Sequence, residues 1–251
     1  PFDDEHVPWS DWQNGRKERT PYGQLPTLTV TDGEDEQVYT QSGAILRFVA
    51  RMGRRKGLPV DLYPTDSSQM LKIETVLGLA ADFDKALAPS LYLAMSPQKY
   101  GYAEGYSSTL EGKETVRKLR ETFAKETLPR FMQYYSDMLS GHSFFVGDSM
   151  TIADLGVLPQ LRKYVPHLTI TLPSPPTTLL HAYILSPTRF ERGVIEHMRA
   201  NVLDDYPVVK AWYERMMQVP AIADHYATVI PHAHLSQRIG HHGAEEMADS
   251  K

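Results

Sequence analysis

The chain has 251 residues, a length that allows one large domain or two small ones with a sizeable buried core. Its 26 basic and 31 acidic side chains give a formal net charge of -5, which provides no overall attraction for nucleic acid or an anionic membrane. The sequence contains no cysteine, which excludes disulfides, zinc–thiolate sites and thiol nucleophiles and fits a reducing compartment. No apolar run reaches the roughly 20 residues that a membrane-spanning helix requires.

The strand signals lie in the first 40 residues. Residues 2–7 are short and mixed in character, and we expect an edge strand there. Residues 27–31 alternate apolar and hydroxyl side chains, as a strand with one buried face does. Asp32 and Gly33 begin a polar turn, and residues 37–40 are expected to return as the second strand of a hairpin.

Helical periodicity begins after the hairpin, where apolar residues recur at spacings of three and four. The first apolar stripe, which we expect to be buried, consists of Ile45, Phe48, Val49 and Met52. The same pattern continues in residues 70–93, 116–135 and 209–219. A segment with strands followed by a helical remainder predicts two unlike domains.

We expect the domains to divide at proline-containing segments. The expected parts are an incomplete first domain at 1–54, a linker at 55–66 and an all-α domain at 67–231. An aperiodic, proline-rich insertion at about 166–189 interrupts the helical region, and residues 232–251 are expected to form a disordered tail. The histidines of that tail lack a fixed scaffold, so we assign no metal site to them.

The chemistry is concentrated between residues 21 and 48. A proline directly before a strand makes Leu25–Pro26 a site where a cis peptide bond can form, because proline cuts the preference for trans to roughly 0.5–1 kcal/mol. A cis bond would turn the N–H and C=O of Leu25 outward to pair with an extended peptide. Gln41 and Ser42 stand where the second strand meets a helix, whose free N–H groups suit a carboxylate. An ordinary turn and a helix cap explain either motif alone, but their order and spacing favour a site for a small peptide.

This order of motifs resembles the glutathione S-transferase superfamily, especially its cytosolic sigma-, alpha- and mu-like branches. The resemblance implies a thioredoxin-like N-terminal domain followed by an all-helical C-terminal domain. In that family a Gly-Gln-Leu-Pro turn receives the cysteinyl part of glutathione, and a Gln-Ser pair binds its γ-glutamyl end. The glutathione-binding residues implied by the resemblance are Trp12, Arg16, Gln24, Leu25, Pro26, Gln41, Ser42 and Asp82.

The resemblance assigns particular roles to three of these residues. Trp12 and Arg16 would contact the glycine end of glutathione, where a guanidinium can bind a carboxylate through two hydrogen bonds. Asp82 aligns with an acidic residue that reaches the amino group across a dimer interface. A solvated helix carboxylate explains Asp82 equally well.

Residues 144–155 are similar to the interior helix motif of the family. Independently of the family, Thr151 and Asp154 form a predicted capping box, with Met150 and Leu155 at the positions of a hydrophobic staple. The expected role of this segment is therefore in folding.

The sequence departs from the family at its beginning. A complete member has a strand, a loop and a helix before Phe2, and the loop carries a Tyr or Ser whose hydroxyl lowers the pKa of the glutathione thiol. No residue of this chain matches that position, so we assign no catalytic residue and expect an N-terminal truncation. Tyr22 matches an aromatic position that is structural by resemblance.

The resemblance implies a cytoplasmic homodimer that transfers the thiolate of glutathione to electrophilic substrates, as in detoxification. Glutathione would be the co-substrate, with no further cofactor, metal, nucleic acid or membrane partner. The second substrate would lie near Tyr92, Tyr100 and Tyr102, although packing at a helix end explains these tyrosines equally well. The alternatives are a non-catalytic structural or scaffolding subunit and a glutathione-dependent isomerase resembling a prostaglandin synthase.

Overall fold

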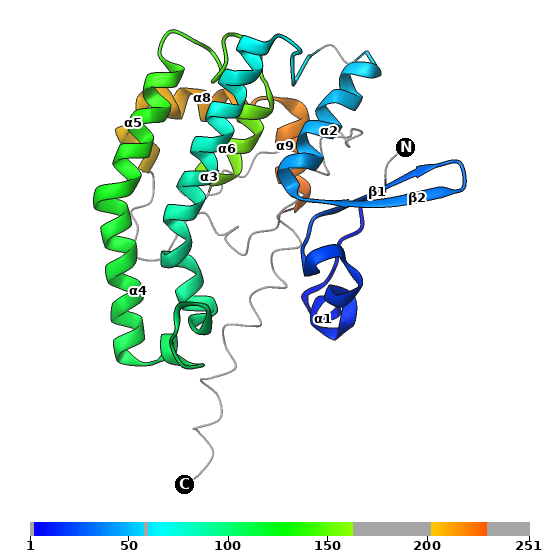
Figure 1. The fold of residues 1–251 in the computed structure, drawn as a ribbon. Helices are drawn as coiled ribbons and strands as arrows, with labels where there is room; N and C mark the ends of the chain where they lie inside the picture. The colour runs from blue at the N-terminus through cyan, green and yellow to red at the C-terminus, as the bar shows by residue number, and fades with distance from the viewer. Residues whose placement is uncertain (1–2, 58–59, 163–201, 230–251) are drawn as a thin grey trace.

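A computed structural model describes residues 3–57, 60–162 and 202–229. The described chain folds into a small N-terminal part with a β-hairpin and a larger helical part (Figure 1). The predicted fold class, a small strand-bearing part followed by an all-helical part, is confirmed. The expected insertion at 166–189 and tail at 232–251 lie outside the described residues.

Short helical turns precede the hairpin. They are α1 (Trp9–Asp11), η1 (Trp12–Arg16), η2 (Lys17–Arg19) and η3 (Pro21–Gly23). The expected edge strand at residues 2–7 is wrong, because residues 3–8 have no regular secondary structure. Its acidic residues Asp3, Asp4 and Glu5 are all exposed, and such residues have low preference for strands, so neither burial nor propensity favours one.

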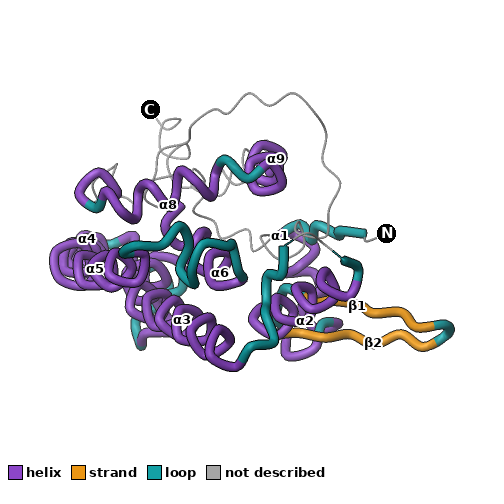
Figure 2. Tube along the Cα trace, turned by 90° about the horizontal axis from the view of Figure 1, so that it is seen from above, coloured by secondary structure: helices purple, strands orange, loops and turns teal. Residues whose placement is uncertain are grey.

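The predicted hairpin is formed by β1 (Thr27–Asp32) and β2 (Asp35–Thr40), which pair antiparallel from Thr27 opposite Thr40 to Asp32 opposite Asp35. Gly33 in the turn has a φ of 65°, a conformation that glycine adopts without steric cost. The hairpin extends well beyond the helices (Figure 2), and most of β2 is exposed. Among the described residues, the hairpin therefore adjoins the rest of the protein at its base.

The helix after the hairpin, α2 (Ser42–Arg55), buries a face that is shifted from the predicted one: Ile45 is buried as predicted, and Val49 and Met52 are half-buried. Its buried residues are Ile45, Leu46, Ala50 and Gly53. Phe48 is 42% exposed, so its predicted burial is wrong. The stripe is rotated because α2 packs against α6, where Leu46 and Ala50 join the main core.

The helical part surrounds one buried helix, α6 (Ile152–Arg162), which packs against α2, α3 and α8 (Figure 2). Helix α3 (Ser67–Met95) runs beside a rod formed by α4 (Leu110–Thr122), η6 (Phe123–Thr127) and α5 (Leu128–Leu139) (Figure 1). The remaining described elements are η4 (Pro97–Tyr100), η5 (Tyr106–Ser108), η7 (Val202–Asp205), α8 (Pro207–Met217) and α9 (Pro220–Val229). Phe83, Phe131 and Trp212 belong to the shared core.

Half of the predicted capping box at the start of α6 is confirmed: the Asp154 side chain accepts from the Thr151 N–H, but Oγ1 of Thr151 accepts from the N–H of Ala153 at 3.2 Å instead of from that of Asp154. The Asp154 carboxylate accepts hydrogen bonds from the N–H of Thr151 at 2.8 Å, the N–H of Phe145 at 3.0 Å and Nε1 of Trp212 at 2.9 Å. Burial nevertheless raises the pKa of Asp154, and these donors oppose the rise. The carboxylate thus connects α6, the preceding loop and α8.

The described residues contain neither a membrane-spanning helix nor a cluster of metal-ligating side chains. No described helix combines the length and the apolar character needed to cross a bilayer. Residues 3–57, 60–162 and 202–229 also contain no group of three or more His, Asp or Glu side chains arranged to hold a metal ion.

Candidate functional site

The hairpin register brings the two predicted binding motifs together. Thr27 follows Pro26 in the chain, Thr40 precedes Gln41, and these two threonines are partners across the sheet. Directly opposed residues of antiparallel strands lie about 4.5–5.5 Å apart, so the turn and the helix start are neighbours. Their side chains meet as well, because Nε2 of Gln41 donates to Oε1 of Gln24 at 3.4 Å.

The turn has the backbone geometry that the sequence predicts. The Leu25–Pro26 peptide bond is cis. Within the part of the chain that the structure describes, no hydrogen bond uses the N–H or C=O of Leu25, and its side chain is exposed. An extended peptide can therefore pair with this backbone as a neighbouring strand would.

The start of α2 has an unusual backbone conformation. Gln41 has φ 72° and ψ 102°, in a region that residues other than glycine rarely adopt. Its C=O accepts hydrogen bonds from the N–H groups of Ala44 at 2.9 Å and Ile45 at 3.0 Å. Its side chain makes no capping bond to the helix, so the N–H groups of Ser42 and Gly43 remain for an anion.

The segment with Trp12 and Arg16 lies against the same turn. The N–H of Gly23 donates to Thr20 at 3.1 Å, and the Lys17 side chain packs against Gly23. Trp12 is half-buried, and the Arg16 guanidinium forms an ion pair with Glu5. A ligand carboxylate that binds Arg16 would therefore have to displace the Glu5 carboxylate.

Other residues singled out from the sequence are not part of this group. Asp82 is exposed on α3 and, among the described residues, shares no hydrogen bond or ion pair with Gln24, Gln41 or Ser42. Tyr22 is 82% exposed, so it adds no core packing within this chain. The tyrosines proposed for the second substrate are also exposed; they are Tyr92, Tyr100 and Tyr102.

No role for Arg47 was predicted from the sequence, and the structure places this residue beside the site. Its Nη1 donates to the C=O of Gly43 at 2.6 Å, and its Nε donates to Oε1 of Glu74 at 2.8 Å. A second bond joins Nη2 to Oε2 of Glu74. The hydrogen bonds from Arg47 hold the pKa of Glu74 below its ordinary value. The four-residue spacing from Gly43 is visible in the sequence, but the partner 27 residues away is not.

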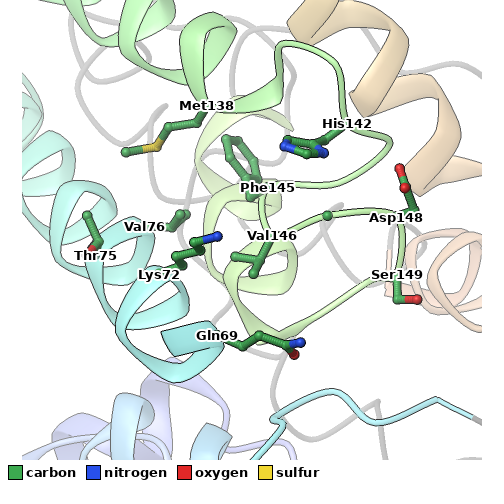
Figure 3. A pocket seen from close by; sticks show the side chains of 11 residues that line it. Gln69, Lys72, Thr75, Val76, Met138, His142, Phe145, Val146, Asp148 and Ser149 are labelled. Atoms are coloured by element: carbon green, nitrogen blue, oxygen red, sulfur yellow. The ribbon is translucent and has the colours of Figure 1, made fainter. Parts of the chain in front are cut away.

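A cavity of about 530 Å³ lies elsewhere, between the first turns of α3 and the loop that follows α5 (Figure 3). Its lining includes the apolar side chains of Val76, Phe145 and Val146 together with Lys72 and His142. None of the binding residues predicted from the sequence lines it. This cavity is therefore distinct from the candidate site.

The fold and the site together define a thioredoxin-like hairpin-and-helix unit joined to an all-helical part. Residues 102–179 match the family described as "Glutathione S-transferase, C-terminal domain". Glutathione S-transferase 1 of Ascaris suum is 28% identical over 220 residues, which cover 87% of this chain and 86% of that protein. Glutathione S-transferase 1 of Zea mays is 25% identical over 217 residues, which cover 86% of this chain and 78% of that protein.

Solved structures share the fold. Prostaglandin synthase D of Nilaparvata lugens aligns with a TM-score of 0.57 at 20% identity, over 89% of this chain and 82% of that chain. The glutathione S-transferase from Ascaris lumbricoides aligns with a TM-score of 0.50 at 22% identity, over 91% of this chain and 84% of that chain. The family match, the named relatives and the shared fold support membership of the glutathione S-transferase superfamily.

Proposed function

We propose that this protein binds glutathione and transfers its thiolate to electrophilic substrates. The observation that carries the proposal is the pairing of Thr27 with Thr40, which sets the exposed backbone of Leu25 beside the uncapped start of α2. Relatives named glutathione S-transferase match most of the chain and support the same activity.

In this proposal the protein holds glutathione at three points. The backbone of Leu25 pairs with the cysteinyl part of the tripeptide. The N–H groups of Ser42 and Gly43, with the Ser42 hydroxyl, bind the γ-glutamyl carboxylate. Arg16 binds the glycine carboxylate. Holding the thiol in one place promotes its reaction with an electrophile, because two reactants no longer have to find the correct geometry by diffusion.

The remaining parts of the proposal concern the partners. Two copies of the chain would form a cytoplasmic homodimer, across which Asp82 reaches the amino group of glutathione. The electrophile would lie near Tyr92, Tyr100 and Tyr102, which are exposed. The hydroxyl group that activates the thiol is assigned to no residue of this chain.

Retention on immobilised glutathione tests the binding step. We expect the full chain to be retained and to be released by free glutathione, and the variant with both Gln41→Ala and Ser42→Ala to pass through. The matched control changes Ser68→Ala and Gln69→Ala, an exposed Ser-Gln pair at the start of α3, and should be retained. Failure of the folded wild-type chain to bind would overturn the proposal.

A conjugation assay with glutathione and a chromogenic electrophile tests the reaction. Turnover by wild-type protein, lost in the Gln41→Ala and Ser42→Ala variant, supports the transferase. A folded protein that binds glutathione without conjugating it would instead be the non-catalytic subunit. A glutathione-dependent isomerase would be recognised by rearrangement of a substrate without consumption of glutathione.

A further inference from the structure

The first turn of α2 has little apolar packing to hold it. Gln41, Ser42 and Ala44 are exposed, whereas the buried positions begin at Ile45 and continue through Leu46 toward the end of the helix. Apolar burial therefore fixes the later turns of α2 and leaves the position of the first turn to polar contacts.

Arg47 supplies such a contact. Its Nη1 donates to the C=O of Gly43 at 2.6 Å, directly after Ser42. A residue four positions later on a helix lies on the same face, and its side chain leans toward the N-terminal end. The guanidinium of Arg47 therefore reaches the turn whose N–H groups face the proposed ligand.

The other side of the guanidinium is fixed to α3. Nε and Nη2 bind the two oxygens of Glu74, a forked arrangement that sets direction as well as distance. Glu74 also accepts a hydrogen bond from Oη of Tyr63 at 2.8 Å. The Tyr63 side chain is buried in the core, and Arg51 lies over its ring at 5.1 Å from the centroid. Glu74 is thus held from two directions.

We propose that Arg47 is a positioning residue for the glutathione site, and that it fixes the first turn of α2 relative to α3 through Glu74. The inference rests on the proposed function, because the ligand it positions is the γ-glutamyl carboxylate at Ser42 and Gly43. Arg47 does not contact glutathione. The helical part of the protein thereby contributes to glutathione affinity through a residue outside the binding surface.

Isothermal titration of the full chain with reduced glutathione tests the effect on affinity. Loss of hydrogen bonds to a charged group predicts that Arg47→Met raises Kd by roughly 10-fold or more. Glu74→Gln, which frees the guanidinium, should raise Kd by a smaller factor. Arg47→Lys keeps the positive charge but cannot form the two parallel hydrogen bonds of the guanidinium to Glu74. The Kd of this variant should therefore lie between those of wild type and Arg47→Met.

Arg54→Met is the matched control. It removes the same charge from the same helix, but Arg54 pairs with Asp61 at 3.5 Å and lies in the last turn of α2. Its Kd should stay within about twofold of the wild-type value, since exposed ion pairs contribute little. A Kd that changes equally in Arg47→Met and Arg54→Met would show a general charge effect and overturn the proposal.

Hydrogen exchange of the unliganded chain separates the positioning claim from the proposed function. Exchange at the amides of Ala44 and Ile45, which bond to Gln41, should speed up in Arg47→Met and Glu74→Gln but not in Arg54→Met. Amides of α8 should be unaffected, which verifies folding. If Arg47→Met does not fold, Arg47→Lys and Glu74→Gln decide the result.

These readouts give distinct outcomes. If the wild-type chain does not bind glutathione, the proposed function fails and exchange at Ala44 and Ile45 alone decides whether Arg47 positions the turn. If the wild type binds and the Arg47 and Glu74 variants match it in both Kd and exchange, the positioning role is wrong while the proposed function stands.

Discussion

Gln41 has a backbone conformation that glycine would adopt more easily. Non-glycine residues at positive φ cost of order 1–3 kcal/mol, and such residues cluster at functional sites. We expect Gln41→Gly to leave the urea unfolding midpoint unchanged or raised, while weakening glutathione binding because the contact with Gln24 is lost. Urea unfolding and titration with glutathione measure the two effects. A lower midpoint would show that the Gln41 side chain stabilises the fold.

Glu5 occupies the guanidinium proposed to bind the glycine carboxylate of glutathione. Glu5→Gln removes the competing charge from Arg16, and exposed ion pairs contribute up to about 1 kcal/mol, so glutathione should bind up to about 5-fold tighter. Asp3→Asn, an exposed change two residues earlier, is the control. Weaker binding in the Glu5 variant would mean that Glu5 orients Arg16 rather than competing for it.

The individual site residues differ in how far the sequence predicts their surroundings. The contact of Asp154 with the Thr151 N–H follows from local chemistry, and the cis bond at Leu25–Pro26 was expected from the order of the motifs; the structure has both. The pairing of Arg16 with Glu5 and of Arg47 with Glu74 does not follow from local chemistry. Ion pairs between distant segments depend on how the chain packs, for which single residues give no signal.

At the scale of elements, two glycines in helices allow the effect of close packing on stability to be distinguished from the effect of helix propensity. A Cβ at Gly112 of α4 would lie 1.9 Å from the C=O oxygen of Tyr106, a backbone atom that cannot move aside easily. A Cβ at Gly78 of α3 would meet no atom of the described residues within 4 Å. Alanine is favoured over glycine in an exposed helix by about 1 kcal/mol. We therefore expect Gly78→Ala to stabilise the protein and Gly112→Ala to destabilise it.

Thermal and urea unfolding of the two glycine variants measure these changes. Both substitutions add one methyl group to a helix, so each serves as the control for the other. Equal stabilisation by both would show that the segment of Tyr106 moves away from α4 without cost, contrary to the close packing in the structure.

The link between α2 and α3 should depend on pH. The pKa of Glu74 is lowered, mainly by its hydrogen bonds with Arg47, so its folded value lies below the ordinary value of 4.5. A lowered carboxyl pKa contributes stability above the unfolded pKa, and this contribution is lost as pH falls through the folded pKa. The difference in unfolding free energy between wild type and Glu74→Gln should be constant above about pH 5 and shrink below pH 4.5.

Urea unfolding at a series of pH values measures this difference, with Gln69→Ala as a control on the exposed start of α3. A difference that grows on acidification would contradict the assignment of the lowered pKa to Glu74.

Local sequence patterns predict where the hairpin and the helices form but only partly predict which face of a helix is buried. Turn chemistry and alternation predict the hairpin, and the spacing of apolar residues predicts the helices. The same spacing predicts the buried face of α2 only in part, because Ile45 is buried as predicted but Phe48 is exposed and Ala50 is buried in its place. Periodicity shows that a helix is amphipathic, but its partner determines which face is buried, and here that partner is α6, which lies about 100 residues away in the sequence.

At the scale of the whole molecule, the N-terminal part exposes several large apolar side chains. They are Tyr22, Leu25, Val38, Tyr39 and Phe48. Large exposed apolar patches mark surfaces that another molecule covers. In line with the proposed homodimer, sedimentation equilibrium at micromolar concentration should give about twice the chain mass of 28.4 kDa. A mass equal to one chain across that range would contradict the dimer.

The sequence by itself determined the hairpin, the turn at Leu25–Pro26 and the Asp154 cap of α6, because each depends on residues a few positions apart. The fold class followed from the order of strand and helix signals and from the resemblance of the motifs. Only the tertiary structure decided that Thr27 opposes Thr40, that α2 turns Leu46 toward α6, and that Arg47 joins Glu74. These contacts connect segments that are distant in the sequence. Their free energy depends on how side chains fit once the helices have packed, which local preference alone does not specify.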